Sequence, residues 1–100
     1  MKRVTSIEQL QKGSKIVRVN GGTLQTLEFI YVHPHNEKYS VFLDENYDGA
    51  PKFYNPRLEE EEWYLFNDTV EDWNEIYDMK IAQLQREIEY IEEYRRKYNK

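Results

Sequence analysis

The last third of the chain places the strongest limit on its fold. Between Asp68 and Tyr98 there is no glycine and no proline, so nothing in this stretch interrupts a helix. Asp68 can cap the first turn, with Glu71 three residues later as its reciprocal partner. Acidic residues crowd the beginning of the stretch and basic residues its end, as the helix dipole favours. We therefore predict one amphipathic helix of about 30 residues.

The apolar face of this helix narrows along its length. Its first turns offer a broad face suited to packing on the rest of the domain, made by Val70, Trp73, Ile76 and Tyr77. A narrow seam with the alternating four- and three-residue spacing of a coiled coil follows: Tyr77, Ile81, Leu84, Ile88 and Ile91.

The helix is also too long for the body it follows. A rod of about 45 Å exceeds the dimensions of a globule of this chain length, whose radius of gyration is about 13 Å. We therefore expect the seam to be buried against another chain, and a homodimer is the assembly that we favour. The alternative is that the seam packs on the domain's own sheet.

Five short runs of β-branched and aromatic residues precede the helix. They cover residues 15–19, 23–33, 38–45, 51–55 and 60–66, and glycine, proline and asparagine turns separate them. The turn at residues 20–22, Asn-Gly-Gly, predicts a hairpin between the first two strands. Before them, Thr5 and Glu8 form a capping-box pattern for a short helical turn, and Gly13 suits a left-handed conformation after it.

The segment IEQLQKGSKIVRV, residues 7–19, resembles the opening of many SH3-like barrels. The resemblance concerns the fold and indicates no family. Together with the strand pattern it predicts an α+β protein. Residues 1–67 are expected to form a small five-stranded SH3-like barrel or curled antiparallel sheet, and residues 68–100 the long helix, a possible coiled coil.

The composition excludes several classes. The chain contains no cysteine, which excludes disulfide frameworks and thiolate metal sites and is typical of a reducing compartment. No signal peptide follows Met1, and no apolar run approaches the length needed to span a bilayer, so we expect a cytoplasmic protein with no membrane contact. The net charge of −5 divides into +3 for residues 1–40 and −8 for residues 41–100. Only the N-terminal part could therefore attract a phosphate backbone.

Residues 44–55, DENYDGAPKFYN, begin like a calcium-binding loop. Asp44, Asn46, Asp48 and Gly49 fit the first half of an EF-hand. However, position 12 is an asparagine instead of a bidentate glutamate, and position 9 is a lysine. We therefore predict a turn and no calcium site.

Catalytic and metal-binding patterns are not evident elsewhere in the sequence. His33 and His35 could share a metal, but no third ligand is indicated, and we predict an exposed loop. There is no cysteine nucleophile, nucleophile elbow or phosphate-binding glycine loop. The four glutamates at residues 59–62 are typical of a solvated approach to a strand. We expect no enzyme activity and no cofactor.

Two groups of side chains are candidate binding surfaces of the barrel. One could form a ligand face for a peptide, or simply the core: Tyr39, Tyr47, Phe53, Tyr54 and Tyr64. The other could contact nucleic acid: Lys2, Arg3, Lys15 and Arg18.

These features favour a non-enzymatic protein–protein interaction module. It would self-associate, or bind a protein partner, through the C-terminal helix and the aromatic residues of the barrel. A small nucleic-acid-binding barrel that uses the basic N-terminal segment is one alternative. Another is an inhibitor or accessory protein of a phage or other mobile element, because short, acidic, cysteine-free chains are common there.

Overall fold

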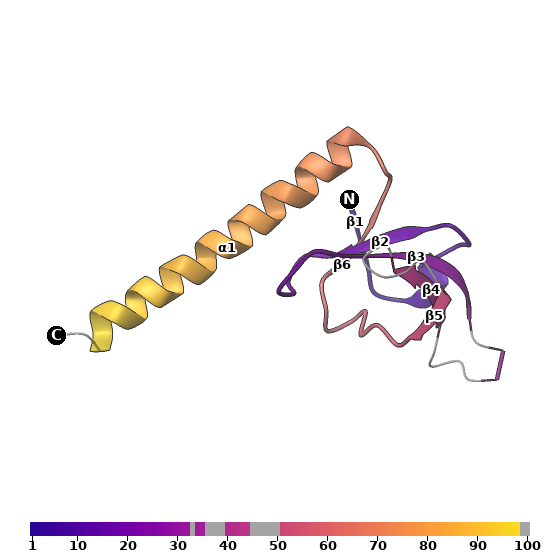
Figure 1. Ribbon diagram of the computed structural model, residues 1–100, viewed down its shortest axis with the longest axis horizontal. Helices are drawn as coiled ribbons and strands as arrows, with labels where there is room; N and C mark the ends of the chain where they lie inside the picture. The colour runs from indigo at the N-terminus through magenta and orange to yellow at the C-terminus, as the bar shows by residue number, and fades with distance from the viewer. Residues whose placement is uncertain (33, 36–39, 45–50, 99–100) are drawn as a thin grey trace.

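A computed structural model of the protein describes residues 1–32, 34–35, 40–44 and 51–98. A six-stranded antiparallel sheet is followed by one long helix, so the protein belongs to the α+β class (Figure 1). The helix runs out past the sheet, and the molecule measures 58 × 31 × 26 Å along its principal axes.

The N-terminal segment contains a strand that the sequence pattern did not reveal, β1 (Lys2–Val4). A short 3₁₀ helix, η1 (Ile7–Gln9), follows it. The capping box of η1 joins Ser6 and Gln9, one residue later than the predicted pair of Thr5 and Glu8. Gln9 is the capping partner in place of Glu8 because its side-chain oxygen accepts from the backbone N–H groups of both Thr5 and Ser6, at 2.7 and 3.0 Å.

Each of the five predicted strands contains an observed one. They are β2 (Lys15–Arg18), β3 (Gln25–Val32), β4 (Ser40–Asp44), β5 (Pro51–Tyr54) and β6 (Trp63–Phe66). The hairpin predicted between β2 and β3 is confirmed. Gly13 has a φ of 89°, as predicted, in the turn that leads into β2.

The sheet is open, with the strand order β1-β6-β2-β3-β4-β5. β6 lies between β1 and β2, so that Leu65 is opposite both Lys2 and Ile16. The predicted closed five-stranded SH3-like barrel, or strongly curled sheet, is therefore wrong. Closure requires the two edge strands to hydrogen-bond to each other, and here the edges are β1 and β5, at opposite ends of the strand order.

The two faces of the sheet carry separate hydrophobic clusters. The first cluster is covered by Leu10, after η1, and by Leu58, before β6, and its sheet residues are Val4, Ile16, Leu27, Phe29, Phe42 and Trp63. The second cluster combines Val17 and Phe66 of the sheet with Ile76 of the helix. This alternation follows from the two-residue period of a strand, which places Ile16 and Val17 on opposite faces.

The predicted helix is confirmed as α1 (Val70–Tyr98), of 29 residues. At 1.5 Å per residue it is about 44 Å long. It begins beside β1 and β6, and its C-terminal end lies far from the sheet (Figure 1).

Candidate functional site

The beginning of α1 is fixed by a cap at Thr69. The Thr69 hydroxyl oxygen accepts from the backbone N–H of Asp72 at 3.2 Å. The Asp72 carboxylate in turn accepts from the backbone N–H of Asn67 at 2.6 Å. The capping residue therefore lies one residue later than the predicted Asp68, and the Asp72 carboxylate bonds to Asn67 instead of reciprocally to the cap.

Asp68 has a different role. Its carboxylate accepts from the indole N–H of Trp73 at 2.6 Å and from the ammonium of Lys15 at 3.2 Å. The pKa of Asp68 lies below its ordinary value. The hydrogen bond from Trp73 is the largest cause, and the hydrogen bond and the positive charge of Lys15 add to it. Asp68 thus connects the segment before the helix to β2 and to the first turns of α1.

The first half of α1 is docked on the sheet. Ile76 is fully buried in the second cluster. The Trp73 ring lies edge-on to Phe66, with centroids 5.3 Å apart. Further along, the Lys80 ammonium donates to the backbone oxygens of Val19 and Gly21, at 3.1 and 2.6 Å. These contacts attach the helix to β6 and to the hairpin between β2 and β3.

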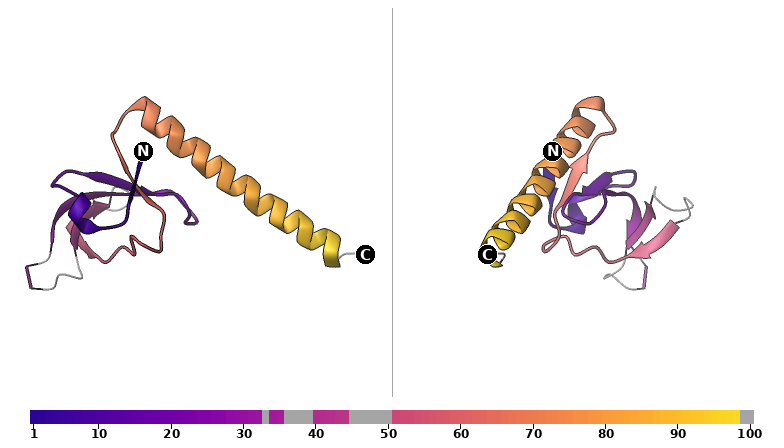
Figure 2. Two further views of the ribbon diagram at one scale, coloured as in Figure 1. Left: turned by 180° about the vertical axis from the view of Figure 1, so that it is seen from behind. Right: turned by 60° about the vertical axis from the view of Figure 1, so that its left-hand side comes forward.

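The seam predicted from the sequence is exposed in this chain. Its five residues are between 44 and 59% exposed: Tyr77, Ile81, Leu84, Ile88 and Ile91. They lie roughly 100° around the helix from the docked residue Ile76, at 100° per residue. Every residue of α1 from Leu84 onward is exposed, and Figure 2 shows this half of the helix extending away from the sheet. The seam therefore does not pack on the sheet of its own chain.

A second apolar strip follows the docked face of the helix toward its end, and the sequence analysis missed it. Tyr90, Tyr94 and Tyr98 are between 56 and 67% exposed. Their rings stack along the helix, with centroids 6.5 Å and then 4.5 Å apart. The four-residue spacing of these tyrosines was the available signal. We call these three residues the tyrosine strip.

The three described members of the predicted aromatic ligand face, Phe53, Tyr54 and Tyr64, do not all lie on one face of the sheet. Phe53 is 60% exposed on β5, whereas its neighbour Tyr54 points to the opposite face and packs on Phe42. Tyr64 is half-buried and packs against the second cluster. Tyr39 and Tyr47 lie outside the described residues.

The predicted nucleic-acid contacts are divided between the two faces of the sheet. Lys2 and Arg18 point to one face, and Arg3 and Lys15 to the other, as the strand register requires. Three of the four are engaged with oxygen atoms. Lys15 pairs with Asp68, and Arg18 pairs with Glu61 at 2.7 Å. Arg3 donates to the backbone oxygen of Glu61, also at 2.7 Å.

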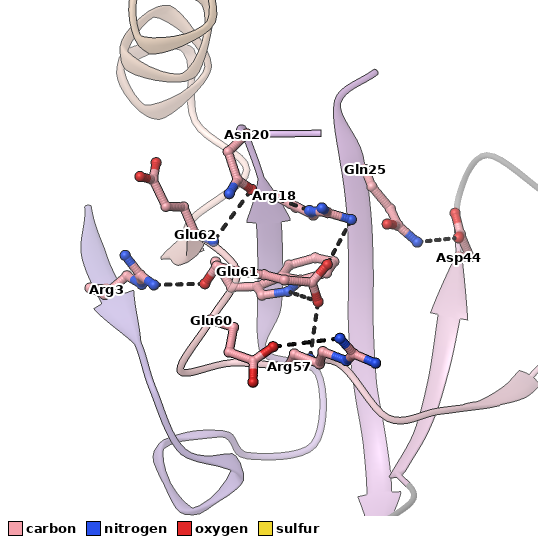
Figure 3. A network of polar contacts seen from close by, with 10 residues as sticks. Arg3, Arg18, Asn20, Gln25, Asp44, Arg57, Glu60, Glu61 and Glu62 are labelled. Carbon is pink, nitrogen blue, oxygen red and sulfur yellow. Dashed lines mark hydrogen bonds and ion pairs between the residues drawn. The ribbon is translucent and has the colours of Figure 1, made fainter. Parts of the chain in front are cut away.

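Glu61 is the centre of a polar network beside β2 and β6 (Figure 3). Its carboxylate accepts from the Trp63 indole at 3.3 Å and from the backbone N–H of Arg57 at 3.0 Å, in addition to the Arg18 pair. The prediction of a solvated run at residues 59–62 missed this role. The network ties the segment before β6 to the sheet.

A surface pocket of about 650 Å³ lies beside this network, between the β2–β3 loop and the end of β4. Arg18, Gln25 and Asp44 are its main polar residues. Asp44 is buried and accepts from the Gln25 amide at 3.2 Å and from the Tyr54 hydroxyl at 3.1 Å. These bonds hold the carboxylate in the sheet, which is a structural use of a buried acid.

Among the described residues, no three or more histidine, aspartate or glutamate side chains are grouped so that they could hold a metal ion. Residues 45–50 of the calcium-like segment, and His33, lie outside the described part of the chain. Of that segment, Asp44 ends β4, and residues 51–54 form β5.

No protein-family model, curated protein or solved structure gives a significant match to the chain. Within the described residues, no helix is both long enough and apolar enough to cross a bilayer. The exposed half of α1, with its seam and its tyrosine strip, is therefore the candidate functional surface.

Proposed function

We propose that this protein is a non-enzymatic interaction module that self-associates through its C-terminal helix. The observation that carries the proposal is the exposure of the seam, which begins at Tyr77 and ends at Ile91. The face of α1 that contains Ile76 already joins the helix to the sheet. The exposed apolar seam is not needed for that contact and is available to a partner. Fully burying one leucine or isoleucine stabilises an assembly by about 1.5–3 kcal/mol.

The heptad positions support a helical pair. Ile81 and Ile88 occupy a positions, and Leu84 and Ile91 occupy d positions, so every a and d position of this segment is apolar, as in a coiled-coil seam. Asn74 and Arg95 occupy the a positions on either side, so polar side chains bound the apolar segment. Because that segment spans only two heptads, we expect a weak dimer that forms at micromolar or higher concentration.

Light scattering across a concentration series tests the proposal. The wild type is expected to approach the mass of a dimer at about 100 μM, near the weak end of specific association. Leu84→Glu with Ile88→Glu should give a monomer with an unchanged helical circular dichroism signal, because both residues are already exposed within the chain.

Arg86→Glu is the matched control. It lies between the two substituted residues on the opposite side of the helix, and it changes the net charge by the same two units. This variant should still dimerise. A wild type that stays monomeric across the whole series, or an Arg86→Glu variant as monomeric as the double variant, would contradict the proposal.

The ion pairs of the basic residues on β2 do not favour nucleic acid as the partner. Lys15 and Arg18 are each paired with a carboxylate, so binding a phosphate there would first require breaking those pairs.

A further inference from the structure

The exposed half of α1 carries two apolar features that a single partner must cover. The seam and the tyrosine strip lie on adjacent sides of the helix, and the strip continues the line of the docked residue Ile76 into the exposed half. Covering both requires a partner that contacts the seam and also reaches around to the strip. A second copy provides two such surfaces, its own helix and its own sheet.

We infer that two copies pair with their helices antiparallel, so that the tyrosine strip of each lies beside the helix–sheet junction of the other. The inference rests on the proposed self-association and adds its geometry. Centring the pair on Arg86 places Ile81 of one copy opposite Ile91 of the second copy, and Leu84 opposite Ile88. This alignment gives each isoleucine and leucine of the seam an apolar partner.

Charge favours this orientation. The first turns of α1 carry Glu71, Asp72, Glu75 and Asp78, and the last turns carry Arg95, Arg96 and Lys97. In the antiparallel alignment, residues 95–97 of one copy come opposite residues 75–77 of the second copy, so Lys97 is level with Glu75 and the basic end lies beside the acidic first turns. A parallel pair would instead bring like charges together at both ends, including Arg95 against Arg95. Antiparallel helix dipoles also attract one another.

The tyrosine strip supports the same orientation independently. Lys80 and Tyr94 are fourteen residues apart and occupy the same heptad position, on the flank of the seam nearest the sheet. In an antiparallel pair, that flank of one helix faces the same flank of the other. Tyr94 of the second copy therefore lies beside Lys80, which is bonded to the backbone of Val19 and Gly21. In a parallel pair it would lie beyond both sheets.

Distances between spin labels decide the orientation. The chain has no cysteine, so Arg86→Cys and Glu93→Cys each supply one labelling site. Both residues are exposed, and they share one heptad position on the side of α1 away from the seam. In an antiparallel pair centred on Arg86, labels at position 93 are displaced along the axis by about 21 Å, whereas labels at position 86 are level. For labels about 25 Å apart across the pair, the distance at position 93 is then longer by roughly 8 Å.

Each outcome separates the inference from the proposal on which it rests. A dimer in which both positions give the same distance is either parallel or antiparallel and centred between residues 89 and 90, and both results overturn the pair centred on Arg86 and leave self-association intact. A dimer with the shorter distance at position 93 overturns the centring on Arg86. A monomer by light scattering overturns both.

A second measurement tests the contact of the tyrosine strip. Tyr94→Ala should raise the dimer dissociation constant about tenfold, as the loss of a buried aromatic anchor does. Glu93→Ala, one residue away and on the outer side of the helix, should change it less than about twofold. Equal effects of the two variants would show that the strip is not covered in the dimer.

Discussion

Replacing Ile76 with alanine tests whether the first half of α1 is part of the hydrophobic core of the sheet. Ile76 is 0% exposed, and it packs against Val17 and Phe66. The loss therefore includes the full transfer term of the deleted atoms and a cavity term, since neighbours on a strand relax little. Substitutions of this kind cost about 2–5 kcal/mol. A loss near 3 kcal/mol lowers the melting temperature of a chain of this size by roughly 12–24 °C.

Ile81→Ala is the matched control, because it deletes the same atoms from the same helix. Ile81 is 52% exposed and lies in the seam. At low micromolar concentration, where a weak dimer dissociates, its substitution should change the free energy of unfolding by no more than about 0.5 kcal/mol. Urea unfolding, followed by both tryptophan fluorescence and helical circular dichroism, measures the two losses, and coincident transitions would validate a two-state analysis.

The comparison has a clear negative result. If Ile76→Ala loses less than about 1 kcal/mol, or no more than Ile81→Ala, the helix does not depend on its contact with the sheet. In that case the docking of the first half of α1, and the division of the helix into a docked and an exposed half, would be wrong.

Two further substitutions test the junction between the helix and the sheet. Asp68→Asn should destabilise the protein at neutral pH, and the difference from the wild type should shrink in urea unfolding as the pH falls below about 4. The sign follows from the lowered pKa of Asp68: a carboxylate favoured by folding contributes above its unfolded pKa and loses that contribution as it is protonated. Lys80→Met should cost about 1–3 kcal/mol, because it leaves the backbone oxygens of Val19 and Gly21 without this donor. Lys97→Met, at an exposed position, should be neutral in the same assay, and equal losses would contradict the role given to Lys80.

Local patterns predicted the elements that are long or strongly periodic. The helix was predictable because 29 residues without glycine or proline carry a helical apolar period. The strands from β2 to β6 were predictable because turn residues separate runs of β-branched and aromatic side chains. The spacing of the seam also predicted a face that its own sheet leaves exposed.

Features that depend on distant partners were not predictable from local pattern. β1 has three residues, too few to show a period, and it exists through its pairing with β6. Asp68 and Thr69 can both cap a helix, and the choice depends on Lys15, which lies on β2 and binds Asp68. Glu61 is one of four consecutive glutamates, and it is the one that forms an ion pair with Arg18.

The binding surfaces proposed for the sheet show the same limit. The aromatic and basic groups were defined by residue type, whereas the register of the strands decides which members share a face. Phe53 and Tyr54 are neighbours in sequence and lie on opposite faces. The tyrosine strip was not predicted for a related reason, because its constant four-residue spacing departs from the alternating four- and three-residue spacing of the seam.

The insertion of β6 between β1 and β2 has a consequence for how the chain folds during synthesis. β2, β3, β4 and β5 are neighbours in both chain and sheet, so they can pair as they emerge. β1 has no such neighbour, because its partner is β6. Bringing the two together closes a long segment of chain, which carries an entropy cost and slows folding. Until residues 63–66 are made and placed, β1 and one edge of β2 remain unpaired. Nascent chains halted before residue 63 should therefore be the species most prone to pair with one another and aggregate.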